Sequence, residues 1–254
     1  MIHNPLSIAG KNIVITGAAS GIGRQCAIDF SYSGANLILL DINEEELAAT
    51  KDLCNKDVCC NYYKCDLTDA SLLKTVVDTM VIENGPVDGM LYAAGIEKTL
   101  PYNHLSETDY SRIYSVNVVA AMSLLNLLTK KKYRGEHSKY VLISSITSVV
   151  GRPGVAAYAA SKGAIVSLVK TLALEMASKE MTINCISPGT ILTPLMQKML
   201  DSLTEEQQEE RKNGFPLGLG KPSDISATAM FLLSDGARWI TGQNIIVDGG
   251  FTSR

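Results

Sequence analysis

The sequence has no excess of positive charge. Its 23 Lys and Arg residues face 26 Asp and Glu residues, giving a formal net charge of −3 and an isoelectric point near 5.7. Proteins that bind nucleic acid usually present a basic surface to the phosphates, so we expect no nucleic-acid partner. We also find no stretch that is apolar over the roughly 18 residues of a membrane-spanning helix, and no secretion signal at the N-terminus. The expectation is a cytoplasmic protein without a membrane span.

Cysteine and histidine do not occur in the patterns that metal sites or disulfide frameworks require. Four of the six cysteines crowd one short region, namely Cys54, Cys59, Cys60 and Cys65. Their spacing lacks the C-x2-C pairs of zinc sites, none of the three histidines lies nearby, and no export signal suggests an oxidising compartment. We therefore favour reduced, partly buried thiols over a disulfide or a metal site, and expect no metal ion.

What the sequence does contain is an alternation of strand-length apolar runs with amphipathic helical stretches. The runs are apolar throughout, as in parallel strands that helices cover on both faces. With 254 residues, 46% of them hydrophobic, the chain suits one domain with a sizeable core. We predict an α/β, doubly wound Rossmann fold as a single domain over residues 1–254. The expected strands are Asn12 to Thr16, Asn36 to Leu40, Asp88 to Ala93, Tyr140 to Ser144, Thr182 to Ser187 and Ile245 to Val247. The expected helices are Ile22 to Ser33, Glu44 to Leu53, Ser71 to Glu83, Glu107 to Leu128, Ala157 to Lys179 and Pro222 to Leu233.

The stretch from Thr193 to Gly214 differs from the rest of the chain. It has helical propensity, is highly charged and stands between two core elements. We interpret residues 193–214 as an insertion over a site and a candidate lid.

A glycine-rich turn, TGAASGIG, follows the first strand and opens the first helix, with Gly17, Gly21 and Gly23 at its key positions. A tight turn needs a residue that is free to adopt positive φ, and a pyrophosphate needs close approach of the backbone. The helix N-terminus adds unpaired N–H groups that favour negative charge. Such a turn alone is weak evidence, but its place after a strand favours a dinucleotide site.

An acidic residue, Asp41, ends the second strand, 18 residues beyond Gly23. That is close to the roughly 20 residues expected for the acid that binds the adenosine ribose hydroxyls. The carboxylate would repel a 2′-phosphate, and neither Ser20 nor Ile42 offers a compensating cation. Arg24 is a nearby cation that weakens the argument slightly. The prediction is NAD in preference to NADP.

A second cluster is YAASK, in which Tyr158 and Lys162 are four residues apart and so share one face of a helix. We expect the Lys162 ammonium to lower the pKa of Tyr158 toward working pH, so that the phenol can exchange a proton with an alcohol or ketone oxygen. Upstream, the strand YVLISS ends in Ser144 and Ser145, at the sheet edge where ligands bind in this architecture.

In the order of these motifs, the whole chain resembles the short-chain dehydrogenase/reductase family. The resemblance implies a catalytic set of Asn117, Ser145, Tyr158 and Lys162, with Ser145 preferred to Ser144 for its spacing of thirteen from Tyr158. It assigns Ser145 to orienting the reacting oxygen, Lys162 to the ribose hydroxyls and Tyr158, and Asn117 to a water that links Lys162 to solvent.

The resemblance also implies the rest of a cofactor site, a sheet of about seven strands and a homotetramer. Where the family usually has Asn-Asn-Ala-Gly, this chain has Tyr92, Ala93, Ala94 and Gly95, a departure that we interpret as a family variation. The implied cofactor contacts, besides those of Tyr158 and Lys162, are Gly17, Ser20, Gly21, Ile22, Gly23, Asp41, Asp66, Leu67, Ala94, Gly95, Pro188, Gly189, Ile191 and Thr193.

The substrate stays open at this point, although a small-molecule ketone or alcohol is expected. The mainly apolar candidates for its site are Ile96, Ile146, Val155 and the stretch from Leu192 to Phe215. The resemblance is nearest to 3-oxoacyl-[acyl-carrier-protein] reductases, and an acyl-carrier protein is a candidate partner for a basic cluster of Lys130, Lys131, Lys132 and Arg134, with Lys179 elsewhere. A polyol or hydroxysteroid dehydrogenase is the alternative, and a non-catalytic NAD-binding scaffold is a third.

Overall fold

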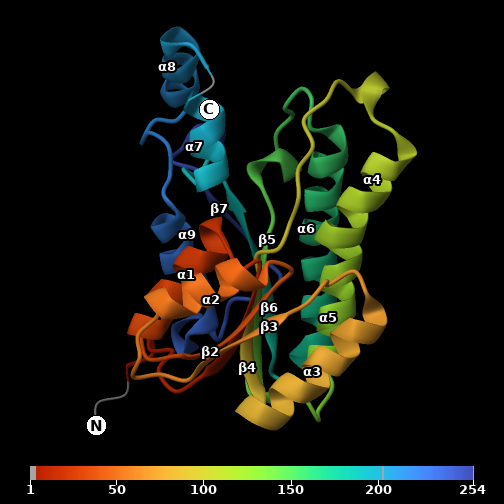
Figure 1. The fold of residues 1–254 in the computed structure, drawn as a ribbon, viewed down its shortest axis with the longest axis vertical. Helices are drawn as coiled ribbons and strands as arrows, with labels where there is room; N and C mark the ends of the chain where they lie inside the picture. Colours follow the sequence, from red (N-terminus) through yellow and green to blue (C-terminus); the bar gives the residue numbers. More distant parts are fainter. Residues whose placement is uncertain (1–3, 202, 254) are drawn as a thin grey trace.

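A seven-stranded parallel sheet forms the centre of the molecule, in a computed structural model that describes residues 4–201 and 203–253 (Figure 1). Its strands lie in the order β3-β2-β1-β4-β5-β6-β7. They are β1 (Asn12–Thr16), β2 (Asn36–Asp41), β3 (Cys60–Lys64), β4 (Val87–Tyr92), β5 (Arg134–Ile143), β6 (Thr182–Pro188) and β7 (Asn244–Val247). The doubly wound single domain expected from the sequence is confirmed.

Helices cover both faces of this sheet, and alternate strand residues point into two separate cores. Ile13 and Ile15 pack with α1 (Gly21–Tyr32), α2 (Glu44–Leu53) and α9 (Pro222–Leu233). Val14, between them, packs with the opposite layer of α3 (Ala70–Asn84), α5 (Ala120–Leu128) and α6 (Ala156–Ala177). Burial on both faces explains why the strand sequences are apolar throughout.

One strand, β3, was not predicted from the sequence. The edge strand β3 has the sequence CNYYK, and its residues are half-buried or exposed apart from Cys60. It pairs only with β2, from Leu37 against Cys60 to Asp41 against Lys64. An edge strand needs no continuous apolar run, because one of its sides is open to solvent.

The apolar segment Glu107–Leu128 corrects the expectation that no stretch reaches membrane-span length. An 18-residue stretch within it has a mean hydropathy of 1.3, and 44% of that stretch is buried inside the protein. It is also not one regular helix, because a π-helical turn at Ser115–Val119 separates α4 (Glu107–Tyr114) from α5. Buried residues such as Leu124 and Leu128 lie in the core against α3 and α6, so packing accounts for much of its apolar character.

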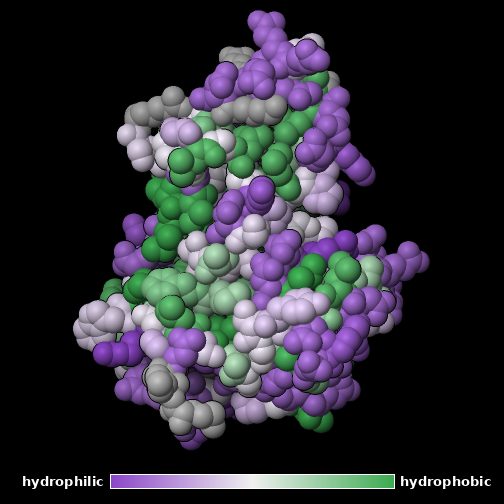
Figure 2. Space-filling model, turned by 90° about the vertical axis from the view of Figure 1, so that its left-hand side faces the viewer, coloured by the Kyte–Doolittle hydropathy of each residue, from purple (hydrophilic) through white to green (hydrophobic). Residues whose placement is uncertain are grey.

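The carboxyl ends of the parallel strands form the edge at which the site lies. The chain order of the strands reverses between β1 and β4, and this is the point at which open α/β sheets form a ligand crevice. Above this edge stand α7 (Pro194–Asp201) and α8 (Glu205–Asn213), so the helical propensity of residues 193–214 is confirmed (Figure 1). Figure 2 shows that hydrophilic side chains cover the top of the molecule, where α8 lies.

Candidate active site

Three positions of the turn between β1 and α1 leave little room for a side chain. Gly17 has φ +66°, and a Cβ there would lie 2.8 Å from the Ala94 nitrogen. A Cβ on Gly23 would collide with the Gly17 carbonyl, whereas one on Gly21 would press on the Thr193 side chain at 3.2 Å. The turn thus touches both the loop after β4 and the start of α7, and its surface is backbone that a phosphate can approach closely.

A cavity of about 1070 Å³ begins at this turn and runs along the carboxyl edge of the sheet. It exceeds the 300–1,000 Å³ typical of drug-sized ligands, as a dinucleotide site should. Most residues expected to contact the cofactor line it, namely Gly17, Ser20, Gly21, Ile22, Gly23, Asp41, Asp66, Leu67, Ala94, Gly95, Tyr158, Lys162 and Thr193.

Asp41 lines this cavity beside the glycine turn, and the backbone around it fixes its carboxylate. One oxygen accepts a hydrogen bond from the Ala19 nitrogen at 3.1 Å and the other from the Asn43 nitrogen at 3.1 Å. The neighbouring Arg24 is engaged by other groups, because its guanidinium forms an ion pair with Glu46, donates to the Ala19 carbonyl and donates to the Thr50 hydroxyl at 2.9 Å. The carboxylate therefore keeps acceptor capacity for a ligand hydroxyl, while the nearest cation is engaged.

The loop after β4 is held without the asparagine pair that the family usually has. The Thr16 hydroxyl accepts hydrogen bonds from the Ala93 and Ala94 nitrogens, both at 3.2 Å. The Tyr92 hydroxyl donates to the Val116 carbonyl at 2.6 Å, which ties β4 to the π-helical turn. These bonds hold the loop in a chain that departs from the family pattern at Tyr92 and Ala93.

Tyr158 and Lys162 lie on α6, beside Ser145, which follows the end of β5. Lys162 is buried and donates a hydrogen bond to the Ile143 carbonyl at 2.9 Å, with its nitrogen 5.6 Å from the centre of the Tyr158 ring. Ser144, Ser145 and Tyr158 line a second cavity. The Ser144 hydroxyl donates to the Lys162 carbonyl at 2.9 Å, whereas the Ser145 hydroxyl accepts from the Thr147 nitrogen at 3.2 Å. Ser145 rather than Ser144 as the catalytic serine stays a prediction from the family spacing, because both residues line this cavity.

The pKa of Tyr158 does not move in the expected direction. Burial and the Glu97 carboxylate raise it to about 12, although the Ser145 hydroxyl and Arg152 act the other way. Burial also lowers the pKa of Lys162 to about 8. The net shift of the Tyr158 pKa is therefore opposite to the expected one, because burial of the phenol dominates, and the Lys162 ammonium bonds to the Ile143 carbonyl.

Asn117 lies behind the cavities and lines neither of them. Its side chain accepts from the Ile96 nitrogen at 2.8 Å and donates to the Ile96 carbonyl and the Ser161 hydroxyl, both at 3.0 Å. A Cβ on Gly95 would come within 3.2 Å of the Lys162 nitrogen and 3.3 Å of the Asn117 oxygen. Asn117 therefore joins the loop after β4 to α6 and holds this loop close to the Lys162 nitrogen.

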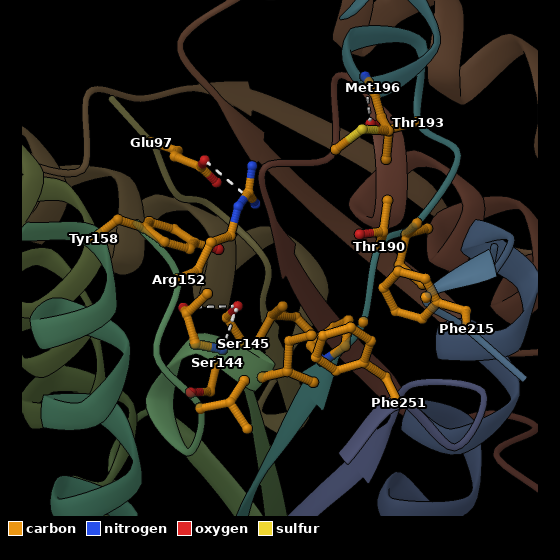
Figure 3. Close-up of a pocket in the computed structure, with 18 of the residues that line it drawn as sticks. Glu97, Ser144, Ser145, Arg152, Tyr158, Thr190, Thr193, Met196, Phe215 and Phe251 are labelled. Carbon is orange, nitrogen blue, oxygen red and sulfur yellow. Dashed lines mark hydrogen bonds and ion pairs between the residues drawn. The ribbon is translucent and has the colours of Figure 1, made fainter. Parts of the chain in front are cut away.

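The second cavity, of about 420 Å³, lies beside the first (Figure 3). The two share Ile22, Glu97, Ile143, Tyr158 and Thr193. Of the expected residues, the second cavity brings together Ser145, Tyr158, Pro188, Gly189, Ile191 and Thr193. Phe215 and Phe251 stack across from the serines, with ring centres 4.7 Å apart (Figure 3). This cavity has a mainly apolar wall on one side and hydroxyl groups on the other.

Sequence reasoning found some of this lining and missed the rest. Ile146 and Phe215 line the smaller cavity and Ile96 the larger, but Val155 is buried and lines neither. The ion pair between Glu97 and Arg152 lies in the smaller cavity and was not predicted. The sequence did offer one signal, the charged Arg152 between Ser145 and Tyr158. Its partner Glu97 is 55 positions away, and no local sequence pattern connects the two residues.

The thiols of the cysteine-rich region stay outside both sites, apart from Cys65 in the lining of the larger cavity. All six cysteines of the chain are free, and Cys54, Cys60 and Cys65 are buried. Among the described residues, no group of three His, Cys, Asp or Glu side chains could hold a metal ion.

Comparison with known proteins gives matches over nearly the whole chain. The family model described as enoyl-(acyl carrier protein) reductase matches residues 17–252. The chain is 32% identical to the 3-oxoacyl-[acyl-carrier-protein] reductase FabG of Thermotoga maritima, over 96% of this chain and 99% of the relative. It is 32% identical to the oxidoreductase UcpA of Salmonella typhimurium, over 96% and 95%.

Solved structures show the same fold. A 7α-hydroxysteroid dehydrogenase complexed with NADH and 7-oxo glycochenodeoxycholic acid superimposes with a TM-score of 0.91 at 30% identity, covering 98% of each chain. A putative short-chain alcohol dehydrogenase from Sinorhizobium meliloti reaches a TM-score of 0.92 at 28% identity, covering 98% of this chain and 99% of the other. The chain therefore belongs to the short-chain dehydrogenase/reductase family and is a nucleotide-dependent oxidoreductase that resembles 3-oxoacyl-[acyl-carrier-protein] reductase.

Proposed function

We propose that this chain is a cytoplasmic, NAD(H)-dependent oxidoreductase that interconverts a ketone and a secondary alcohol, with Tyr158 as the acid/base. One observation carries the proposal. The smaller cavity joins the larger one at Tyr158. Ser145 lines the smaller cavity, and Lys162 lines the larger one beside the Tyr158 ring. A substrate oxygen and the end of a dinucleotide can therefore approach the same phenol.

When bound, the nicotinamide supplies or accepts the hydride. In the reductive direction Tyr158 donates its proton to the carbonyl oxygen, and in the oxidative direction it takes that proton back. Ser145 holds the same oxygen by a hydrogen bond, while Lys162 binds ribose hydroxyls and adds positive charge beside the phenol. We assign Asn117 to holding the β4 loop, and its place in a π-helical turn suits the water contact that the family resemblance implies.

The choice of NAD over NADP is supported by the surroundings of Asp41. Its carboxylate would repel a 2′-phosphate, and the nearby Arg24 is engaged by Glu46 and Thr50. In the solved hydroxysteroid dehydrogenase of the same fold, the bound cofactor is NADH. Residues 193–214 are proposed as a lid, because Thr193, Met196 and Lys198 contribute to the cavity linings.

A second candidate function is reduction of 3-oxoacyl groups on a carrier protein, which the names of the FabG relatives favour. The basic cluster gives it no support, because Lys130, Lys131, Lys132 and Arg134 precede or begin β5. They lie at the amino edge of a parallel sheet, opposite the cavities. Dehydrogenases of hydroxysteroids and polyols remain alternatives within the enzyme class.

The test is a fluorescence titration with NADH and NADPH, followed by a screen of ketones and alcohols. We expect tighter binding of NADH, turnover of at least one substrate, and loss of turnover in Tyr158→Phe with NADH binding retained. Clear preference for NADPH would contradict the role of Asp41. Binding without turnover of any ketone or alcohol would favour a scaffold.

A further inference from the structure

Among the described residues that line the smaller cavity, Arg152 is the one cation. It follows the short helix at Ile146–Ser148 and precedes α6, so the chain brings it to the cavity between Ser145 and Tyr158. Its side chain is 35% exposed, and Figure 3 shows it between Glu97 and the serines. Its proximity to Tyr158 is sufficient to oppose the rise in the phenol's pKa.

The hydrogen-bonding capacity of Arg152 is unspent. Within the described residues its guanidinium donates no hydrogen bond, and its ion pair with Glu97 spans 4.0 Å from Nη1 to Oε1. That Glu97 oxygen already accepts from the Thr99 hydroxyl at 3.1 Å. A half-exposed pair at this separation contributes little to folding stability. Glu97 therefore orients the guanidinium and leaves its donors available.

We propose that Arg152 binds the carboxylate of the substrate, which makes the substrate class a small oxo acid and the corresponding hydroxy acid. A guanidinium matches a carboxylate with two parallel hydrogen bonds, and this geometry selects an acid over an ester or a neutral ketone. The inference rests on the proposed function, because it places the carbonyl between Ser145 and Tyr158.

The remaining surfaces of the cavity limit the rest of that acid. The nicotinamide end of the cofactor and the substrate must share about 420 Å³, so the acid is small. Across from the serines, the stacked Phe215 and Phe251 offer an apolar surface for its alkyl or aryl part (Figure 3). The pattern is a molecule with a carboxylate at one end, a ketone in the middle and an apolar tail.

The experiment compares the oxopentanoate isomers, which differ in the distance from carbonyl to carboxylate, with their methyl esters. For the best acid we expect kcat/KM about tenfold or more above that of its ester, the range of a charge-assisted hydrogen-bonded pair. Arg152→Ala should remove that preference mainly through KM and leave the ester within about twofold. Arg152→Lys should restore part of it, and Lys131→Ala, which removes an exposed cation just before β5 and outside both cavities, is the control.

Calorimetric titration of the NADH-loaded Tyr158→Phe protein, with and without Arg152→Ala, with the same acids gives a readout that does not need turnover. Turnover of ketones and esters without any preference for an acid overturns the Arg152 inference and leaves the proposed function intact. Equal losses for acid and ester in Arg152→Ala also overturn it, since they indicate a structural role. If nothing turns over, the proposed function fails, and acid binding that is absent or unaffected by Arg152→Ala overturns the inference separately.

Discussion

At the scale of single residues, Lys162 shows a conflict between function and stability. Burial lowers its pKa from the usual 10.5 to about 8, so the folded protein holds its proton less firmly than the unfolded chain. Between these two values the unfolded state binds more protons, and stability rises with pH. Below pH 8 the charged ammonium is kept inside at a cost in free energy that its hydrogen bond to Ile143 offsets only in part.

We predict that Lys162→Met, which keeps the length and removes the charge, abolishes turnover and stabilises the fold at pH 7. The pKa shift corresponds to about 3 kcal/mol, and the lost hydrogen bond returns about 1 kcal/mol or more, which leaves roughly 1–2 kcal/mol. Thermal unfolding at pH 7 and pH 10 measures this difference in stability between variant and wild type. We expect the difference to be smaller at pH 10. A variant that is less stable at pH 7, with an unchanged pH dependence, would contradict this account.

At the scale of elements, the loop after β4 must stay thin for Lys162 and Asn117 to reach their positions. Gly95→Ala would place a methyl group 3.2 Å from the Lys162 nitrogen and 3.3 Å from the Asn117 oxygen. We expect kcat to fall about tenfold to a hundredfold with the fold retained, because small displacements of reacting groups are costly. Steady-state kinetics and circular dichroism measure the two effects.

The matched control for that variant is Gly163→Ala on α6. A Cβ there meets nothing within 4 Å, and an alanine suits a helix interior better than a glycine does. Activity should stay within about twofold, with a gain in stability of about 0.5–1 kcal/mol. Equal losses of activity in both variants would mean that general disturbance of the site, and not contact with Lys162, explains the effect of Gly95→Ala.

Elements that are buried on both sides could be predicted from the sequence, and exposed or irregular ones could not. The apolar runs of β1, β2, β4 and β6 matched the strands within one residue at each end. β3 lacked such a run because it is an edge strand, and the π-helical turn leaves the periodicity of its helix nearly intact. The pair of Glu97 and Arg152 depends on tertiary contact alone, as does the burial that sets the pKa of Tyr158.

At the scale of the whole molecule, the exposed large apolar side chains include two groups that lie on separate surfaces. One surface is formed by α5, α6 and the π-helical turn, with Leu174 81% exposed and Val119 and Met122 beside the turn. The other lies on the C-terminal elements, with Trp239 89% exposed and Ile246 on the edge strand β7. Two self-complementary surfaces on one chain are what a tetramer with crossed twofold axes requires.

We therefore predict a homotetramer, with a mass in solution of four times the 27.3 kDa chain. Light scattering after size exclusion measures it. Leu174→Glu and Trp239→Glu should each remove one type of contact and leave a dimer, because a charge at an apolar interface is costly to bury. A monomeric wild-type protein, or tetramers unaffected by both substitutions, would contradict the two-surface assignment.

The Thr16 hydroxyl has a consequence for how this sequence can change over generations. It alone accepts the hydrogen bonds of the Ala93 and Ala94 nitrogens, and neither alanine carries a polar side-chain atom that could take over. Replacement of Thr16 by valine would orphan two amides at the sheet edge. Drift at position 16 is thus constrained by positions 92 and 93, where the family usually has its asparagine pair, because Ala93 has no polar side-chain atom and the Tyr92 hydroxyl bonds to Val116 instead.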